Sequence, residues 1–140
     1  MPWKWLRPLA RQPTAQIDRG ERGEEAAARY LRRVGYKILV RRFKSRYGEI
    51  DLVCRQGEWL VFVEVKTRAD EQFGAPSEAV NRDKQRHLSR AALEYLRLLH
   101  NPSVRWRFDV VEVLWPPDAA APREVRVIEN AFDLSEPFVY

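Results

Sequence analysis

The sequence has little of what disulfide-bonded and zinc proteins need. Its 140 residues include one cysteine, Cys54, and only two histidines. An intramolecular disulfide is therefore excluded, and a structural zinc site lacks enough Cys and His ligands. A reducing cytosol fits this composition best. Because Cys54 lies in an apolar run, its pattern favours a small core residue over a nucleophile.

Long hydrophobic runs are also missing. No apolar stretch approaches the roughly 18 to 20 residues that a membrane-spanning helix requires. The first 14 residues interrupt their apolar side chains with Lys4, Arg7 and prolines, which does not match a secretory signal peptide. We expect a cytoplasmic protein without membrane segments.

Acidic residues are absent between Glu25 and Glu49, although the chain as a whole carries a net charge of only +5. A cluster of cations attracts a polyanion and releases its counterions, so this interval favours a nucleic-acid partner. A solvated basic face that only aids solubility is the alternative interpretation. The interval contains Arg29, Arg32, Arg33, Lys37, Arg41, Arg42, Lys44 and Arg46.

The length and the 45% hydrophobic content predict one globular domain over residues 1–140. Residues 1–14 are expected to form an irregular basic arm, and the Pro- and Ala-rich stretch 115–122 to be irregular as well. A first helix is predicted from Asp18 to Val34, with Gly35 as a left-handed cap. Its Glu24 shares a helical face with alanines and Leu31 and is expected to point inward.

The remaining patterns predict three strands, a long helix and two further strands. The first three strands are expected at 36–43, 49–55 and 59–67, with a tight hairpin between the last two. The helix is expected from a cap at Ser77 to Leu99, followed by strands at 105–115 and 124–129. The order αβββαβ plus an edge strand predicts an α/β fold with a mixed sheet flanked by helices. The expected buried stripe of the long helix is Val80, Lys84, Leu88, Ala91, Tyr95 and Leu98.

Two charged residues enter the third predicted strand together. Side chains alternate across a strand, so Glu64 and Lys66 share one face while neighbouring valines share the other. Burying such ions without partners costs several kcal/mol each, which indicates a mutual pair, a metal or an open cleft. The hairpin makes the preceding strand a neighbour, so Asp51 can converge on Glu64.

Two carboxylates and a main-chain carbonyl, such as that of Val65, suit a hard cation such as Mg²⁺. Such an ion activates water and polarises a phosphate, while the Lys66 ammonium orients the water or offsets negative charge. The alternative is a buried Glu64–Lys66 pair with Asp51 capping a turn. Asp51, the inward Glu24 and the basic interval together favour catalysis. The expected catalytic residues are Glu24, Asp51, Glu64 and Lys66.

Lys84 and Gln85 lie on the long helix near its start. Both are expected to contact a phosphate or to help hold the nucleophile. For Lys84 the alternative is a side chain that extends past the core and keeps its charge in solvent. No serine has a histidine with an evident acid partner, so serine-type hydrolysis is unsupported. The expected nucleic-acid contacts are Arg41, Arg42, Lys44, Arg46, Arg68, Lys84 and Gln85.

Several ordered motifs, which span roughly residues 18–135, carry a family resemblance. They are GEEAAARYLRRVGY (23–36), GEIDLV (48–53), VFVEVKTR (61–68), FGAPSEAV (73–80), RFDVV (107–111) and ENAFD (129–133). On these motifs the chain resembles the YraN family of predicted bacterial endonucleases. One departure is visible: Arg42 precedes Phe43 where the family usually carries Asn.

That family is similar to the PD-(D/E)XK nuclease superfamily and to archaeal Holliday junction resolvases. The resemblance implies a restriction-endonuclease-like αβββαβ core and a magnesium site, in which Mn²⁺ can substitute. Asp51, Glu64 and Lys66 match the superfamily motif, and Glu24 matches the helix-one acid of resolvase-like members. Because resolvases act as symmetric dimers, the resemblance also implies a homodimer.

Three functions follow as hypotheses. The first is a metal-dependent endonuclease that hydrolyses phosphodiester bonds in DNA, branched or single-stranded. The second is a non-catalytic nucleic-acid-binding protein with a vestigial nuclease site, in which Trp3 and Trp5 stack on bases. The third is a protein-interaction role, with Trp3, Trp5 and Leu6 docking a partner or a second copy of the chain.

Overall fold

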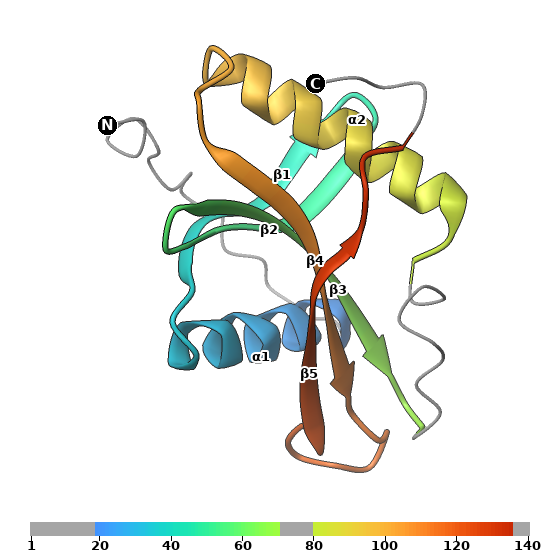
Figure 1. The fold of residues 1–140 in the computed structure, drawn as a ribbon. Helices are drawn as coiled ribbons and strands as arrows, with labels where there is room; N and C mark the ends of the chain where they lie inside the picture. Colours follow the sequence, from blue (N-terminus) through green and yellow to red (C-terminus); the bar gives the residue numbers. More distant parts are fainter. Residues whose placement is uncertain (1–18, 71–79, 136–140) are drawn as a thin grey trace.

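The computed structural model describes residues 19–70 and 80–135. Two helices lie on opposite sides of a five-stranded sheet (Figure 1). The predicted order αβββαβ with an additional strand is confirmed, and it is the arrangement of a restriction-endonuclease-like core. The elements are α1 (Arg19–Arg33), β1 (Lys37–Ser45), β2 (Gly48–Gln56), β3 (Trp59–Arg68), α2 (Arg82–Leu98), β4 (Arg105–Leu114) and β5 (Glu124–Phe132).

The sheet is mixed, with the strands side by side in chain order. β3 and β4 are parallel, while the other three neighbouring pairs are antiparallel. The parallel pair needs a crossover, and α2 provides it. β2 and β3 are joined by a two-residue turn whose Gly57 has φ 59°, a left-handed value that glycine adopts without steric cost. The predicted hairpin is therefore confirmed.

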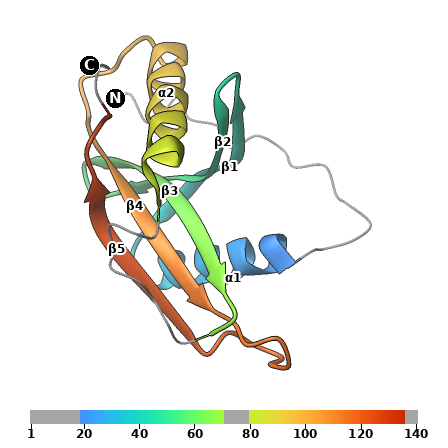
Figure 2. The ribbon, with the colours of Figure 1, turned by 90° about the vertical axis from the view of Figure 1, so that its right-hand side faces the viewer.

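Helix α1 covers one face of the sheet and α2 the other, as Figure 2 shows from the side. α1 buries Ala27, Ala28 and Leu31 completely, and α2 buries Leu88 and Ala92 against the opposite face. α1 ends as predicted, because Gly35 has φ 102° and Tyr36 N donates to Leu31 O at 2.8 Å. Each helix thus closes one half of the hydrophobic core.

The prediction for the second helix is wrong in two details. α2 begins at Arg82, where Asn81 Oδ1 caps it by accepting from Lys84 N at 2.9 Å. The predicted cap at Ser77 lies outside the described residues. Leu98 was expected to be buried but is 63% exposed, whereas Leu96 is fully buried. At 100° per residue, Leu98 falls outside the stripe centred between Leu88 and Ala92.

Strand β5 is longer than the predicted 124–129, since it continues to Phe132. The Phe132 ring stacks on Phe108 of β4 with centroids 4.6 Å apart. A register irregularity between Phe108 and Val110, together with a φ of 50° at Asn130, interrupts the alternating pattern that sequence reasoning follows. Neither helix in the described parts of the chain is long and apolar enough to cross a bilayer.

Candidate metal centre

The candidate site lies where β2 and β3 separate. Their pairing runs from Gln56–Trp59 to Leu52–Val63 and ends there. Beyond this point, β2 continues to pair with β1 and β3 continues to pair with β4. The sheet therefore forks at Asp51, and side chains from both of its faces can meet in the opening. We call this opening the fork.

Asp51 replaces the missing backbone pairing at the fork. Its Oδ2 accepts a hydrogen bond from Val65 N at 2.8 Å. A buried backbone N–H needs an acceptor. This bond therefore satisfies the Val65 N–H and also holds the Asp51 carboxyl against β3. A hollow of about 530 Å³ opens beside the two strands. Its lining includes Glu24, Asp51, Glu64, Val65 and Thr67.

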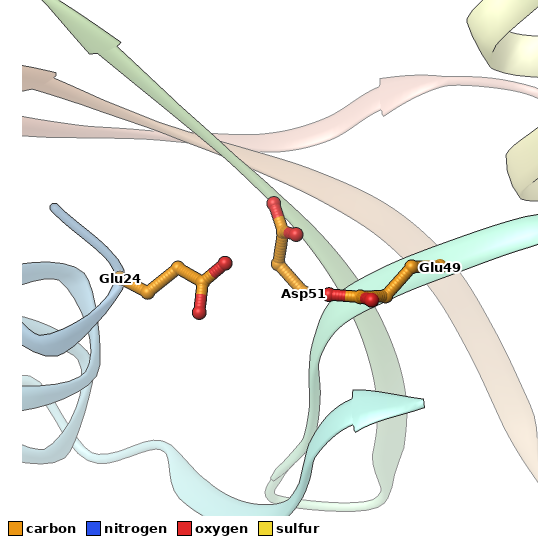
Figure 3. A group of neighbouring side chains, drawn as sticks. All are labelled: Glu24, Glu49 and Asp51. Atoms are coloured by element: carbon orange, nitrogen blue, oxygen red, sulfur yellow. The ribbon is translucent and has the colours of Figure 1, made fainter. Parts of the chain in front are cut away.

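The structure brings the predicted acids Glu24, Asp51 and Glu64 together at this hollow. Glu24 reaches it from α1, and its side chain is only 15% exposed, as its helical face predicts. Figure 3 shows Glu24 pointing from α1 toward Asp51, with Glu49 of β2 beside them. Carboxylate oxygens of Glu24, Glu49 and Asp51 all lie within 4.8 Å of one another. Glu49 is not among the predicted site residues, although strand alternation places it on the same face of β2 as Asp51.

Glu64 is the most enclosed of these acids, with a side chain 5% exposed. Lys84 of α2 approaches it, with Nζ 3.3 Å from Oε2, while the Lys84 side chain remains 37% exposed. Among the described residues, no group donates a hydrogen bond to Oε2, which is buried. A buried carboxylate oxygen without a hydrogen-bond donor, beside a second carboxylate, fits the oxygen ligands that Mg²⁺ prefers.

The pKa of Asp51 reflects its burial beside the Glu64 carboxylate. Burial, the hydrogen bond with Glu64 and the Glu64 charge together raise its pKa to about 8, against the opposing effects of Val65 N–H and Lys84. The pKa of Glu24 is raised too, chiefly by burial, while a hydrogen bond from Arg42 opposes the rise. Two neighbouring acids that resist ionisation indicate a site built to receive positive charge.

The raised pKa of Asp51 predicts the pH dependence of the protein's metal-free stability. An unfolded Asp titrates near pH 4, so the protonated folded carboxyl adds stability that is complete below that pH. This stability is lost as the pH rises toward 8. In EDTA, the melting temperature should therefore fall between pH 5 and pH 9 more steeply for the wild type than for Asp51→Asn. Parallel curves for the two proteins would contradict this expectation.

Lys66 occupies the predicted strand position, two residues after Glu64 on β3. It is half-buried, and its register partner on β4 is Glu112. Lys66 is not among the described residues that line the hollow. Its assignment to catalysis therefore stays a prediction, as do those of Glu24, Asp51, Glu64 and the Val65 carbonyl.

Most of the predicted nucleic-acid contacts form ion pairs within the chain. Arg41 Nη1 lies 2.6 Å from Glu25 Oε2, and Arg68 Nε lies 3.4 Å from Glu112 Oε2. Arg46 pairs with Glu94. Gln85 Nε2 donates to Val80 O at 2.9 Å, which is a local structural contact at the start of α2. Lys44 is exposed. The basic interval is thus less available to phosphates than its composition indicates.

Arg42 differs from the other cations because it points into the candidate site. Its guanidinium lies 2.9 Å from Glu24, 3.0 Å from Glu21 and 3.9 Å from Glu49. Glu21 was not predicted as a site residue, although its position three residues before Glu24 places both acids on one helical face. That spacing could have identified it.

Gly23 lets α1 approach β3 closely enough for Glu24 to reach the fork. A Cβ at this position would lie 2.0 Å from Thr67 Oγ1. Gly23→Ala should therefore push the helix away and destabilise the protein by about 1–3 kcal/mol. Urea unfolding measures the loss, and Thr67→Ala in the same chain should restore part of it. Equal stability of Gly23→Ala and the wild type would show that the contact between α1 and β3 can accommodate the added Cβ.

Comparison with known proteins places this fold and site in a family. The "Uncharacterised protein family UPF0102" matches residues 23–113, which run from within α1 through the fork to the penultimate residue of β4. A UPF0102 protein of Symbiobacterium thermophilum is 50% identical over 113 residues, which cover 81% of this chain and 94% of that protein. A UPF0102 protein of Syntrophus aciditrophicus is 40% identical over 122 residues, which cover 87% and 94%. The chain therefore belongs to the UPF0102 family, the YraN family that its motifs resemble.

Proposed function

We propose that this protein is a magnesium-dependent endonuclease that hydrolyses phosphodiester bonds in DNA. The observation that carries the proposal is the fork, where Asp51 and Glu64 from diverging strands share one hollow. Among the described residues, the buried Glu64 Oε2 has an ion-pair partner in Lys84 but no hydrogen-bond donor, and Asp51 has a raised pKa; both observations favour a bound cation there. Mg²⁺, or Mn²⁺ in its place, is the cation whose ligand preference these oxygens meet.

Each residue has a distinct task in this proposal. Asp51, Glu64 and the Val65 carbonyl would hold the ion, which would supply positive charge to the phosphate and to the attacking water. Lys66 orients the attacking water or offsets the negative charge that develops on phosphorus oxygens. Glu24 adds a further acid at the edge of the hollow. In the hydrolysis, a bond forms between the water oxygen and phosphorus, one ester P–O bond breaks, and the leaving alcohol gains a proton.

A second hollow supports the DNA-binding part of the proposal. It measures about 1110 Å³ and lies between α2, the β1–β2 turn and the start of β4. Its lining combines one carboxylate, Glu94, with three arginines and a 37% exposed Tyr47 ring. Basic and aromatic side chains suit a phosphate backbone and its bases. The arginines are Arg90, Arg97 and Arg105.

The test is cleavage of branched, duplex and single-stranded DNA with Mg²⁺, with Mn²⁺ and with EDTA. We expect cleavage only with a divalent ion, and a loss of at least about 100-fold in Glu64→Gln and Lys66→Ala. Glu58→Gln is the matched control, because Glu58 is exposed in the β2–β3 turn. Both site variants cleaving as fast as the control would overturn the proposal. Salt-sensitive binding without cleavage would favour the non-catalytic alternative instead.

A further inference from the structure

Arg42 adopts a backbone conformation that arginine rarely takes. Its φ is 54°, inside the left-handed region, although it lies within β1. For a residue other than Gly, Asn or Asp this conformation carries a steric cost, which the surrounding structure must offset. The conformation therefore calls for an explanation in the contacts of the side chain.

The Arg42 side chain contacts three carboxylates, which come from two different elements of the fold. Glu21 and Glu24 come from successive turns of α1, and Glu49 comes from β2. The Glu21 side chain is 6% exposed and that of Glu24 is 15% exposed, so Arg42 neutralises acids that are largely removed from water. Such acids need a positive charge nearby to remain ionised.

Glu24 and Glu49 belong to two groups at once. They contact the Arg42 guanidinium, and their oxygens also lie within 4.8 Å of Asp51. Arg42 therefore stands on one side of a continuous acidic cluster, and the Asp51–Glu64 pair stands on the other. Lys84 is the cation on that far side.

We propose that Arg42 takes the place of a second metal ion and so limits the fork to one divalent cation, held by Asp51 and Glu64. When all five acids at the fork are ionised, they carry five negative charges against the two positive charges of Arg42 and Lys84, which leaves an excess of three negative charges. The five acids are Glu21, Glu24, Glu49, Asp51 and Glu64. One divalent ion reduces this excess to one negative charge, whereas a second ion would reverse its sign and lie close to the Arg42 guanidinium. Without Arg42 the excess is four, which two divalent ions neutralise, and Glu24 and Glu49 become free to bind the second. The inference rests on the metal-binding part of the proposed function and not on cleavage.

The experiment counts Mn²⁺ ions bound to the full chain, by calorimetry and by the loss of free Mn²⁺ signal in electron paramagnetic resonance. We expect one ion for the wild type and two for Arg42→Asn, since asparagine tolerates the left-handed backbone. Arg41→Asn is the matched control, because Arg41 is equally half-buried but pairs with Glu25 outside the cluster. It should bind one ion, as the wild type does.

A second substitution keeps the inference testable if Arg42→Asn does not fold. In the wild type, Glu49 lies 3.9 Å from Arg42 and is not one of the two proposed ligands, so Glu49→Gln should change Mn²⁺ affinity by less than about tenfold. Where Arg42→Asn does fold, Glu49→Gln in that background should remove the second ion. One ion bound by Arg42→Asn, two ions or none bound by the wild type, or a tenfold loss caused by Glu49→Gln in the wild type would each overturn the inference. A wild type that binds one ion but cleaves no DNA would contradict the proposed function and leave the role of Arg42 standing.

Discussion

Asp51→Asn is expected to lower DNA cleavage by about 1000-fold, because it removes a charged metal ligand from the fork. The same substitution should leave the metal-free fold intact. The amide oxygen of the substituted side chain can still accept the hydrogen bond from Val65 N that Asp51 accepts in the wild type. A neutral side chain also ends the repulsion between the Asp51 and Glu64 charges, which contributes to the raised pKa of Asp51. Lost activity and retained stability should therefore occur together.

Cleavage rates and melting curves at pH 8.5 measure the two effects. In EDTA, Asp51→Asn should melt at or above the temperature of the wild type. With Mg²⁺ the order should reverse, because an ion that binds only the folded wild type stabilises it. Asp118→Asn, in the exposed β4–β5 loop, is the matched control and should change neither quantity. A large destabilisation of Asp51→Asn in EDTA would show that Asp51 is structural.

Asp109→Ala is expected to remove a large part of the protein's stability, about 3–5 kcal/mol out of a typical total of 5–15. Asp109 of β4 is completely buried. It accepts hydrogen bonds from Tyr36 Oη at 2.7 Å, Arg107 Nε at 2.9 Å and Asn130 N at 2.9 Å. Alanine would leave the Arg107 guanidinium, whose side chain is 9% exposed, without its buried counterion.

Urea unfolding measures this loss, and two further variants separate its causes. Tyr36→Phe removes one of the hydrogen bonds and should cost about 1 kcal/mol. The double variant Asp109→Leu with Arg107→Met removes both charges and should be more stable than Asp109→Ala alone. If Asp109→Ala unfolded at the same urea concentration as the wild type, the buried network would not stabilise the fold. Because Asp109 is completely buried in this network, we expect the aspartate of the RFDVV motif to serve folding and not catalysis.

The candidate site was predictable from the sequence to the extent that it depends on local geometry. Strand alternation placed Glu64 and Lys66 on one face, and a two-residue turn made Asp51 their neighbour. Helical periodicity turned Glu24 inward. These are properties of spacing along one or two adjacent elements, so a pattern of residues carries them without knowledge of the whole fold.

The ion pairs of the basic interval and the position of the fork depend on contacts between distant elements. The interval between Glu25 and Glu49 contains no acid, so its cations looked available for a polyanion. In the fold, Arg41 and Arg42 meet acids of α1, sixteen or more residues away. Nor does any residue pattern show where β2 stops pairing with β3. Leu98 is a different case, because helical periodicity alone places it outside the stripe that α2 buries.

The fork divides the sheet into two prongs, with Asp51 on one and Glu64 on the other. The width of the gap between those carboxylates therefore varies with the angle at which the prongs spread. A rotation of the β1–β2 prong would widen or narrow this aperture, and the hydrogen bond from Val65 N to Asp51 Oδ2 opposes the widening. If the proposed cation binds there, we expect substitutions at the hinge near Leu52 and Val63 to change which ion diameter fits best.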